Sequence, residues 1–310
     1  MNDRTWQPSI SIITPNLDHG RHLRQCIDSV LAQGYPAVEH WVLDGGSKDD
    51  SIEILKSYDG AISWVSNPDA GQAAAINEGF RKATGDVIAW LNSDDYYLPG
   101  AFDAAVAALA REPEALAVHG NGWMVNECGK RLRRYPGFAV ERGDLARKCY
   151  VCQPTVFLRR EVLETEGFLN PDLELCFDYE WWLRILRTRR MAFCPHPLAA
   201  TRQYPSTKTQ ARRSRGLIEA GYVTRHHFGR PHWRWAAKWM VHRWVLGGRS
   251  LALGPTSLAA GLRSAAAYRR RFEPGQEPSP VGRKLLDSLA RHDTGRPRPQ
   301  NRERPSRNDM

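Results

Sequence analysis

The sequence predicts an α/β protein in which a mainly parallel sheet is flanked by helices. Short apolar runs, each long enough for one strand, alternate with segments of helical periodicity. Each apolar run ends in a small group of polar and turn-forming residues. Alternating strands and helices form βαβ units, and the strands of such units run parallel and end at one edge of the sheet.

The expected elements follow in order from the N-terminus. An apolar strand over 9–13 leads into an amphipathic helix over 21–32, which ends before Gly34 as a helix should. Two further strands are expected over 39–43 and 62–65, and each is followed by a helix. The polar residues that follow these strands should therefore meet at one edge of the sheet.

The fourth expected strand, Val87–Leu91, is the most informative segment. It is apolar throughout, as in a strand that is buried on both faces, and Asp94 and Asp95 follow it closely. Paired carboxylates at such a strand end suit Mg²⁺ or Mn²⁺, whose coordination shell is completed by water and by substrate phosphates such as those of a sugar nucleotide. The alternative is that the pair only caps the helix that begins near Leu98.

Six motifs at these strand and helix ends have the order found in family-2 glycosyltransferases. They are Thr14-Pro15-Asn16, Asp44-Gly45-Gly46-Ser47, Asp69-Ala70-Gly71, Asn77-Glu78-Gly79, Gly85-Asp86 and Leu91-Asn92-Ser93-Asp94-Asp95. By these motifs, residues 8 to about 209 resemble the family-2 glycosyltransferases that build bacterial surface polysaccharides. The resemblance implies the Rossmann-like GT-A fold and transfer of a sugar from a nucleoside diphosphate, with UDP expected, to a glycan or lipid-linked acceptor.

The resemblance also implies roles for individual residues. The donor-binding residues are Thr14, Pro15, Asn16, Asp44, Gly71, Asn77, Asp94 and Arg202. Asp44 would accept a hydrogen bond from an N–H group of the nucleobase. Asp95 is the expected ligand of Mn²⁺ or Mg²⁺, and Asp94 would contact the ribose or a water molecule of the metal shell. Asn92 departs from the family pattern, because many relatives carry the first aspartate of an acidic triplet there.

A base must accept the proton of the acceptor hydroxyl. Asp178 precedes an apolar helix with an arginine in its second turn, and by the resemblance it is the catalytic base of a single, inverting displacement. Glu180 is the rival for this role. The alternative for Asp178 is a carboxylate that only interacts with the dipole of the helix that follows.

Aromatic and basic residues on the acceptor side are also candidates. Trp123 and Trp182 could stack on a sugar ring, although large aromatic residues more often pack in a core. Tyr204 stands near the position at which relatives commonly carry a His in a closing loop. Because that His is absent, Arg202 or Lys208 is expected to neutralise the diphosphate leaving group.

Charge divides the chain into two unlike parts. Residues 1–180 hold 17 Lys and Arg against 27 Asp and Glu, whereas residues 181–310 hold 27 against 7, a net charge of +20. We expect a glycosyltransferase domain over 1–228, a basic amphipathic helical extension over 229–292 and a disordered basic tail over 293–310.

The expected extension contains a Trp-rich helix with basic residues on a second face, which is typical of binding to an anionic membrane surface. The alternative is that this helix packs on the domain. No apolar run approaches the roughly 20 residues that span a bilayer, and the first residues do not resemble a signal peptide. We expect a cytoplasmic protein that lies peripherally on the inner face of the plasma membrane.

Other classes of function fit less well. The six cysteines suit a reducing compartment and predict no zinc site. A sugar-nucleotide nucleotidyltransferase would need a phosphate loop rich in Gly, Arg and Lys after the first strand, where Thr14-Pro15-Asn16-Leu17 stands instead. A non-catalytic nucleic-acid-binding protein could use the basic half, but Asp44, Asp95 and Asp178 would then have no role. No nucleic-acid partner is expected.

Overall fold

The computed structural model describes residues 6–135, 137–229 and 234–235. The expected basic extension over 229–292 lies almost wholly outside the described residues, and the expected tail over 293–310 lies entirely outside them. Among the described helices, none is both long and apolar enough to cross a membrane.

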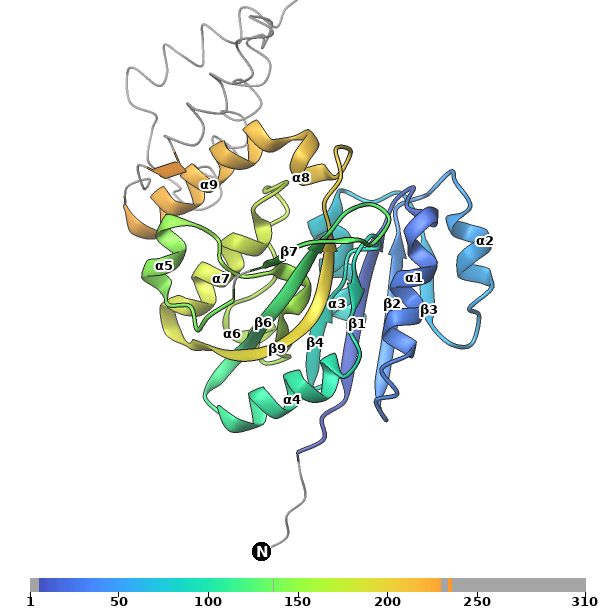
Figure 1. The fold of residues 1–310 in the computed structure, drawn as a ribbon, viewed down its shortest axis with the longest axis horizontal. Helices are drawn as coiled ribbons and strands as arrows, with labels where there is room; N and C mark the ends of the chain where they lie inside the picture. The colour runs from blue at the N-terminus through green and yellow to red at the C-terminus, as the bar shows by residue number, and fades with distance from the viewer. Residues whose placement is uncertain (1–5, 136, 230–233, 236–310) are drawn as a thin grey trace, which may run out of the picture. The chain divides into compact units, whose positions relative to one another are not determined.

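Nine strands of the described residues form one mixed sheet in the order β3-β2-β1-β4-β8-β6-β9-β5, with β7 beside β6 (Figure 1). The first strands are β1 (Ile10–Asn16), β2 (Val38–Asp44), β3 (Ser63–Ser66) and β4 (Val87–Trp90). Between them lie the helices α1 (Gly20–Leu31), α2 (Ser51–Lys56) and α3 (Gln72–Lys82). The predicted α/β class is therefore confirmed.

The four strands of the first half are parallel, as the alternation of strands and helices predicts. Their register places Asn16 beside Asp44 and Asp44 beside Ser66. These three polar residues end β1, β2 and β3, so they lie in a row at one edge of the sheet. The convergence of strand ends that the sequence predicts is present here.

The second half adds antiparallel pairs. Its strands are β5 (Tyr96–Tyr97), β6 (Ala115–Val125), β7 (Arg131–Tyr135), β8 (Phe157–Arg159) and β9 (Arg190–Arg202). Its helices are α4 (Ala101–Arg111), α5 (Arg142–Arg147), a 3₁₀ turn (Gln153–Thr155), α6 (Val162–Thr165), α7 (Phe177–Thr188), α8 (Lys208–Ala211) and α9 (Arg213–Phe228). β8 runs antiparallel to β4 and β6, whereas β9 runs parallel to β6 and brings Arg202 beside Val125.

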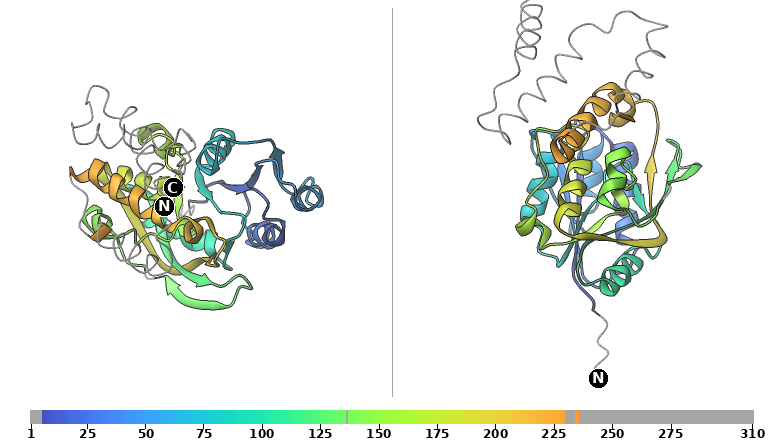
Figure 2. Two further views of the ribbon diagram at one scale, coloured as in Figure 1. Left: turned by 90° about the horizontal axis from the view of Figure 1, so that it is seen from above. Right: turned by 90° about the vertical axis from the view of Figure 1, so that its left-hand side faces the viewer.

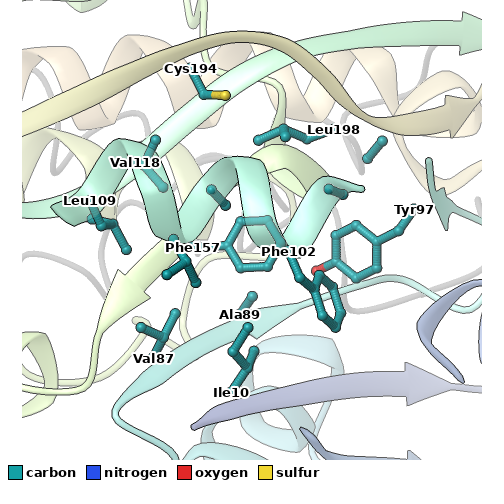
Figure 3. Packing of buried hydrophobic residues seen from close by; sticks show 14 of the residues in the cluster. Ile10, Val87, Ala89, Tyr97, Phe102, Leu109, Val118, Phe157, Cys194 and Leu198 are labelled. Atoms are coloured by element: carbon teal, nitrogen blue, oxygen red, sulfur yellow. The ribbon is translucent and has the colours of Figure 1, made fainter. Parts of the chain in front are cut away.

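The core on one face of the sheet joins the two halves (Figure 3). Ile10 of β1 and Ala89 of β4 face Phe102 of α4 and Phe157 of β8, and all four are buried. The rings of Phe102 and Phe157 pack edge to face, with centroids 5.6 Å apart. Complete burial of one such side chain stabilises a fold by about 1.5–3 kcal/mol, so this cluster fixes β4 against the second half.

The opposite face of β4 carries an aromatic core. Trp90 follows Ala89 and points to the other face, as alternation along a strand requires, and it packs against Trp181 and Trp182 of α7. Trp182 is fully buried and belongs to this core. Of the two expected roles for Trp182, the structure therefore has core packing and not stacking on a sugar ring. On the same side, Gly79 lets α3 approach β1, since a Cβ there would lie 2.3 Å from Cγ2 of Ile13.

Candidate active site

Asp44 organises the turn after β2. Its carboxylate accepts hydrogen bonds from the side chains of Asn16, Ser47 and Ser66 and from the backbone N–H groups of Gly46 and Ser47. Burial raises the pKa of Asp44, but these donors outweigh the burial and lower the pKa overall. Asp44 is therefore ionised at neutral pH and holds the ends of β1, β2 and β3 together.

The predicted contact between Asp44 and a nucleobase stays a prediction, because its oxygens already accept hydrogen bonds from the protein. Beside it, the buried Oδ1 of Asn16 has no hydrogen-bond partner in the described part of the chain. Such an acceptor has the chemistry that an N–H group of a base requires. Thr14 and Pro15 are buried, and Oγ1 of Thr14 lies 2.9 Å from Nε2 of His40.

Asn77 and Gly71, which are also predicted to bind the sugar nucleotide, make structural contacts near the site. The Asn77 amide donates to the carbonyl of Leu169 over 2.8 Å and accepts from its N–H over 3.0 Å, which ties α3 to the segment before α7. Gly71 immediately precedes α3 and has a φ of 109°, a conformation that favours glycine, and its N–H donates to Asp69 over 2.7 Å. Donor binding by Gly71 and Asn77 also stays a prediction.

Asp94 and Asp95 lie at the end of β4 in different environments. Asp95 is 2% exposed, and its carboxylate accepts from the backbone N–H of Arg202 over 2.9 Å and from the Asn92 amide over 3.4 Å. Burial, together with the charge of Asp94, raises the pKa of Asp95 well above its ordinary value. Asp94 is partly exposed, and Oδ2 of its carboxylate accepts from the Tyr204 hydroxyl over 3.1 Å.

Arg202 links this carboxylate pair to three other parts of the chain. Its guanidinium donates to the carbonyl of Asp94, to the Gln25 side chain of α1 and, over 3.2 Å, to the carbonyl of Glu127. It also lies over the Tyr96 ring, 5.2 Å from the centroid. These contacts engage the guanidinium with protein groups, so Arg202 holds the parts of the site together.

A chain of polar side chains crosses from α8 to the end of β4. Nζ of Lys208 donates to the Gln72 side chain over 3.1 Å, the Gln72 amide donates to Asn92 over 2.8 Å, and Asn92 donates to Gln153 over 3.1 Å. Gln153 then donates to the carbonyl of Trp90 over 2.9 Å. The sequence does not point to Gln72, because no local pattern distinguishes the first residue of α3 as a partner of both Lys208 and Asn92.

Asp178 stands at the start of α7 and is partly exposed. Its carboxylate accepts from the N–H of Tyr179 over 2.6 Å. Loss of solvation raises its pKa from 3.8 to about 6, although this hydrogen bond acts in the opposite direction. A carboxylate with a pKa near 6 is ionised at neutral pH and accepts a proton more readily than an ordinary aspartate, as a general base requires.

Glu180, the rival for the role of base, is engaged within the protein. It is 4% exposed, it pairs with Arg184 over 2.9 Å, and Nε2 of His227 lies 3.3 Å from its other oxygen. Burial raises the pKa of Glu180, but the His227 hydrogen bond and the Arg184 charge outweigh the burial and lower it. Glu180 therefore joins α7 to α9 and is poorly placed to take a proton from a substrate.

The predicted metal site offers few protein ligands. In the described part of the chain, no group of three or more His, Cys, Asp or Glu side chains forms a metal cage. The Asp94–Asp95 pair still suits a divalent cation, since Mg²⁺ and Mn²⁺ bind hard oxygens and often take only one or two protein carboxylates. A cation would also relieve the repulsion that raises the pKa of Asp95.

The sheet and the carboxylate pair at its edge have the arrangement that the resemblance to GT-A glycosyltransferases implies. Residues 11–167 match the model of glycosyl transferase family 2, and the chain belongs to this family. The predicted family and fold are thus confirmed.

Relatives and solved structures agree with this assignment. The chain is 25% identical over 222 residues to an uncharacterized glycosyltransferase of Rickettsia typhi, covering 67% of this chain and 68% of the relative. It is 32% identical over 183 residues to one of Mycobacterium tuberculosis, covering 58% and 70%.

Two solved structures share the fold at low sequence identity. S. aureus TarS in complex with UDP-GlcNAc has a TM-score of 0.62 at 14% identity, over 91% of this chain and 89% of that one. The mannosyltransferase PcManGT of Pyrobaculum calidifontis, in complex with GDP-Man and Mn²⁺, has a TM-score of 0.56 at 17% identity, over 93% and 81%.

Proposed function

We propose that this enzyme moves a sugar, with inversion, from a nucleoside diphosphate to a glycan or lipid-linked acceptor in cell-surface polysaccharide synthesis, with UDP as the nucleotide. The observation that carries the proposal is the partly exposed Asp178, whose pKa is about 6, in a family-2 domain with a carboxylate pair at the sheet edge. The family assignment favours glycosyl transfer over nucleotidyl transfer and over non-catalytic binding of nucleic acid.

The donor would bind across the row of strand ends. Oδ1 of Asn16, which has no hydrogen-bond partner among the described residues, would accept from the nucleobase beside Asp44. The diphosphate would then approach Asp94 and Asp95, which would hold Mn²⁺ or Mg²⁺. When bound, the cation would supply positive charge for the diphosphate as the sugar leaves.

The two carboxylates of the pair would have different roles. We assign direct metal contact to Asp94, because it is partly exposed and only Tyr204 binds its carboxylate among the described residues. Asp95 would be the buried partner that Arg202 and Asn92 hold in place. These proposed roles exchange the ones that the resemblance implies for Asp94 and Asp95, and the test of the exchange is given in the Discussion.

Asp178 would accept the proton of the acceptor hydroxyl as the hydroxyl oxygen attacks the anomeric carbon. The bond from that carbon to the diphosphate breaks in the same displacement, so the configuration at the carbon inverts. The leaving diphosphate needs a cation of the protein, and Lys208 fits better than Arg202, whose guanidinium is occupied by protein contacts.

The proposed reaction is tested by its products. We expect the purified protein with Mn²⁺ to be stabilised against heat by one member of a panel of UDP-, GDP- and dTDP-sugars. With that donor, it should release the nucleoside diphosphate and no pyrophosphate. Release of pyrophosphate would instead show nucleotidyl transfer, and failure of every sugar nucleotide to stabilise the protein would contradict the proposal.

Replacement of Lys208 tests its role at the leaving group. Nζ of Lys208 donates to the neutral Gln72 side chain, and no described carboxylate lies within ion-pair distance of it. We expect Lys208→Gln to lower kcat by roughly 10²-fold, because a charge that stabilises the developing diphosphate is lost. Lys208→Arg should retain much of the rate, and Lys82→Gln on the surface of α3 should retain nearly all of it. Equal rates for Lys208→Gln and Lys82→Gln would exclude the role.

A further inference from the structure

The hairpin formed by β6 and β7 carries a run of basic residues that the transfer reaction does not use. β7 begins Arg131-Leu132-Arg133-Arg134, and all four residues are exposed. In the described sheet β7 pairs with β6 alone, so its other edge is unpaired. Figure 2 shows this hairpin, in green, projecting from the edge of the domain. We name Lys130, Arg131, Leu132, Arg133 and Arg134 the basic hairpin.

Among the described residues, the cations of the basic hairpin have no acidic partners. No ion pair involving Lys130, Arg131, Arg133 or Arg134 is present within the described residues. Glu127, in the same turn, is already paired with Arg21 of α1. Four positive charges therefore lie within five residues at a projecting edge, where they produce a local positive potential that attracts an anionic partner.

Arg131 and Arg134 lie on one face of the hairpin, on the same side as the Trp123 ring. The guanidinium of Arg131 lies 4.7 Å from the centroid of the Trp123 ring, and Arg134 lies opposite Trp123 in the β6–β7 register. Residues opposite each other in antiparallel strands share a face. The two charges therefore lie on the same face of the strand, and the ring contact positions that of Arg131.

An apolar side chain lies among these cations. Leu132 is 54% exposed, the largest exposed fraction among the big hydrophobic side chains of the described residues. Phe138, six residues later, is 39% exposed, and its ring packs on Tyr150 at 5.1 Å between centroids. Exposed apolar side chains beside basic ones are typical of surfaces that bind at a bilayer interface, where the apolar group enters the headgroup region.

We propose that the basic hairpin docks on the surface of an anionic lipid bilayer. The charges are complementary to acidic headgroups, and Leu132 supplies an apolar contact that a polyanion in water would not use. The residues of this surface are separate in the sequence from the basic region after residue 229, which lies almost wholly outside the described residues. The docking does not depend on the transfer reaction, so each proposal can hold or fail by itself.

The hairpin is joined directly to the active site. The carbonyl of Glu127, in the turn of the hairpin, accepts from Nε of Arg202 over 3.2 Å, and the backbone N–H of Arg202 donates to Asp95 over 2.9 Å. A docked hairpin would therefore place the carboxylate pair close to the membrane surface. If the proposed function is correct, a lipid-linked acceptor would lie on the same side.

Vesicle binding by the full chain tests the docking. The probe is a vesicle of phosphatidylcholine mixed with phosphatidylglycerol, with phosphatidylcholine alone as the neutral reference. Each cation near an anionic surface strengthens binding by about fivefold, so the triple variant Arg131→Gln, Arg133→Gln, Arg134→Gln should bind the anionic vesicles at least roughly tenfold more weakly. The control variant Lys56→Gln, Arg160→Gln, Arg187→Gln removes the same charge from exposed positions elsewhere and should bind nearly as the wild type.

Leu132→Ser gives a second measurement that leaves the charge unchanged. It should also weaken binding to anionic vesicles, whereas Leu31→Ser, at a residue of α1 that is 41% exposed, should not. Equal binding by the hairpin and control triple variants would overturn the proposal. So would a hairpin effect that is seen with a single-stranded oligonucleotide and not with vesicles, since the partner would then be nucleic acid. Thermal melts should show that all these variants fold.

Discussion

Asp178→Asn is expected to lower kcat by roughly 10²- to 10⁴-fold, the usual contribution of a general base. The amide has nearly the shape of the carboxylate and can still accept from the N–H of Tyr179, so the start of α7 should keep its structure. Affinity for UDP with Mn²⁺ should stay close to that of the wild type, because Asp178 acts on the acceptor. Calorimetric titration with UDP beside a rate assay measures the two effects separately.

The pH dependence of kcat gives an independent measurement of the same group. Asp178 acts in its ionised form, and its pKa is raised from 3.8 to about 6, so kcat should fall as pH decreases through about 6 and recover as pH rises. Glu180→Gln should leave this limb in place. Its expected effect is a lower melting temperature, because Arg184 and His227 lose a charged partner. If Glu180→Gln abolished turnover and Asp178→Asn did not, the two roles would be exchanged.

Replacing Asp94 and Asp95 one at a time should produce different losses. We expect Asp94→Asn to weaken Mn²⁺-dependent binding of UDP by at least about 10²-fold and to leave the melting temperature unchanged. Loss of a residue that only supports a metal ligand weakens binding by about 10- to 10²-fold, so a direct ligand should have the larger effect. Asp95→Ala should destabilise the protein by about 1–3 kcal/mol even without metal, since it removes the oxygen that accepts from the N–H of Arg202. Thermal melts without metal and titration with UDP and Mn²⁺ measure the two losses.

The comparison between the two variants decides the assignment. If Asp95→Ala loses Mn²⁺-dependent binding with a normal melting temperature, and Asp94→Asn keeps both, then Asp95 is the direct ligand, as the resemblance implies. Ser93→Ala is a suitable control on the same turn, because its hydroxyl contacts only His19, 3.1 Å away, among the described residues.

The first half of the fold could be predicted from the sequence because its information is local. Each strand from β1 to β4 is a short apolar run followed by polar residues, and parallel βαβ units bring such ends to one edge. The second half depends on pairing between distant segments. β6 and β9 lie side by side although about 70 residues separate them, and no local pattern reveals which strand would join which.

The same division applies to the site. Asp94, Asp95 and Asp178 could be named from motifs, because each lies at an element end with a recognisable neighbourhood. The sequence could not show which of their carboxylate oxygens are free to bind a ligand, since this depends on residues far along the chain. Asp95 is occupied by the N–H of Arg202, 107 residues away, and burial in the folded protein sets the pKa of Asp178 near 6.

The contacts of Arg202 also have a consequence for biosynthesis of the enzyme. This residue ends β9, the last strand of the described sheet, yet its guanidinium and N–H complete the surroundings of residues more than 100 positions earlier. A nascent chain that has not yet left the ribosome beyond β9 would hold the first four strands and an unfinished carboxylate pair. The carboxylate pair therefore gains its full set of partners only after β9 has been synthesised and has joined the sheet.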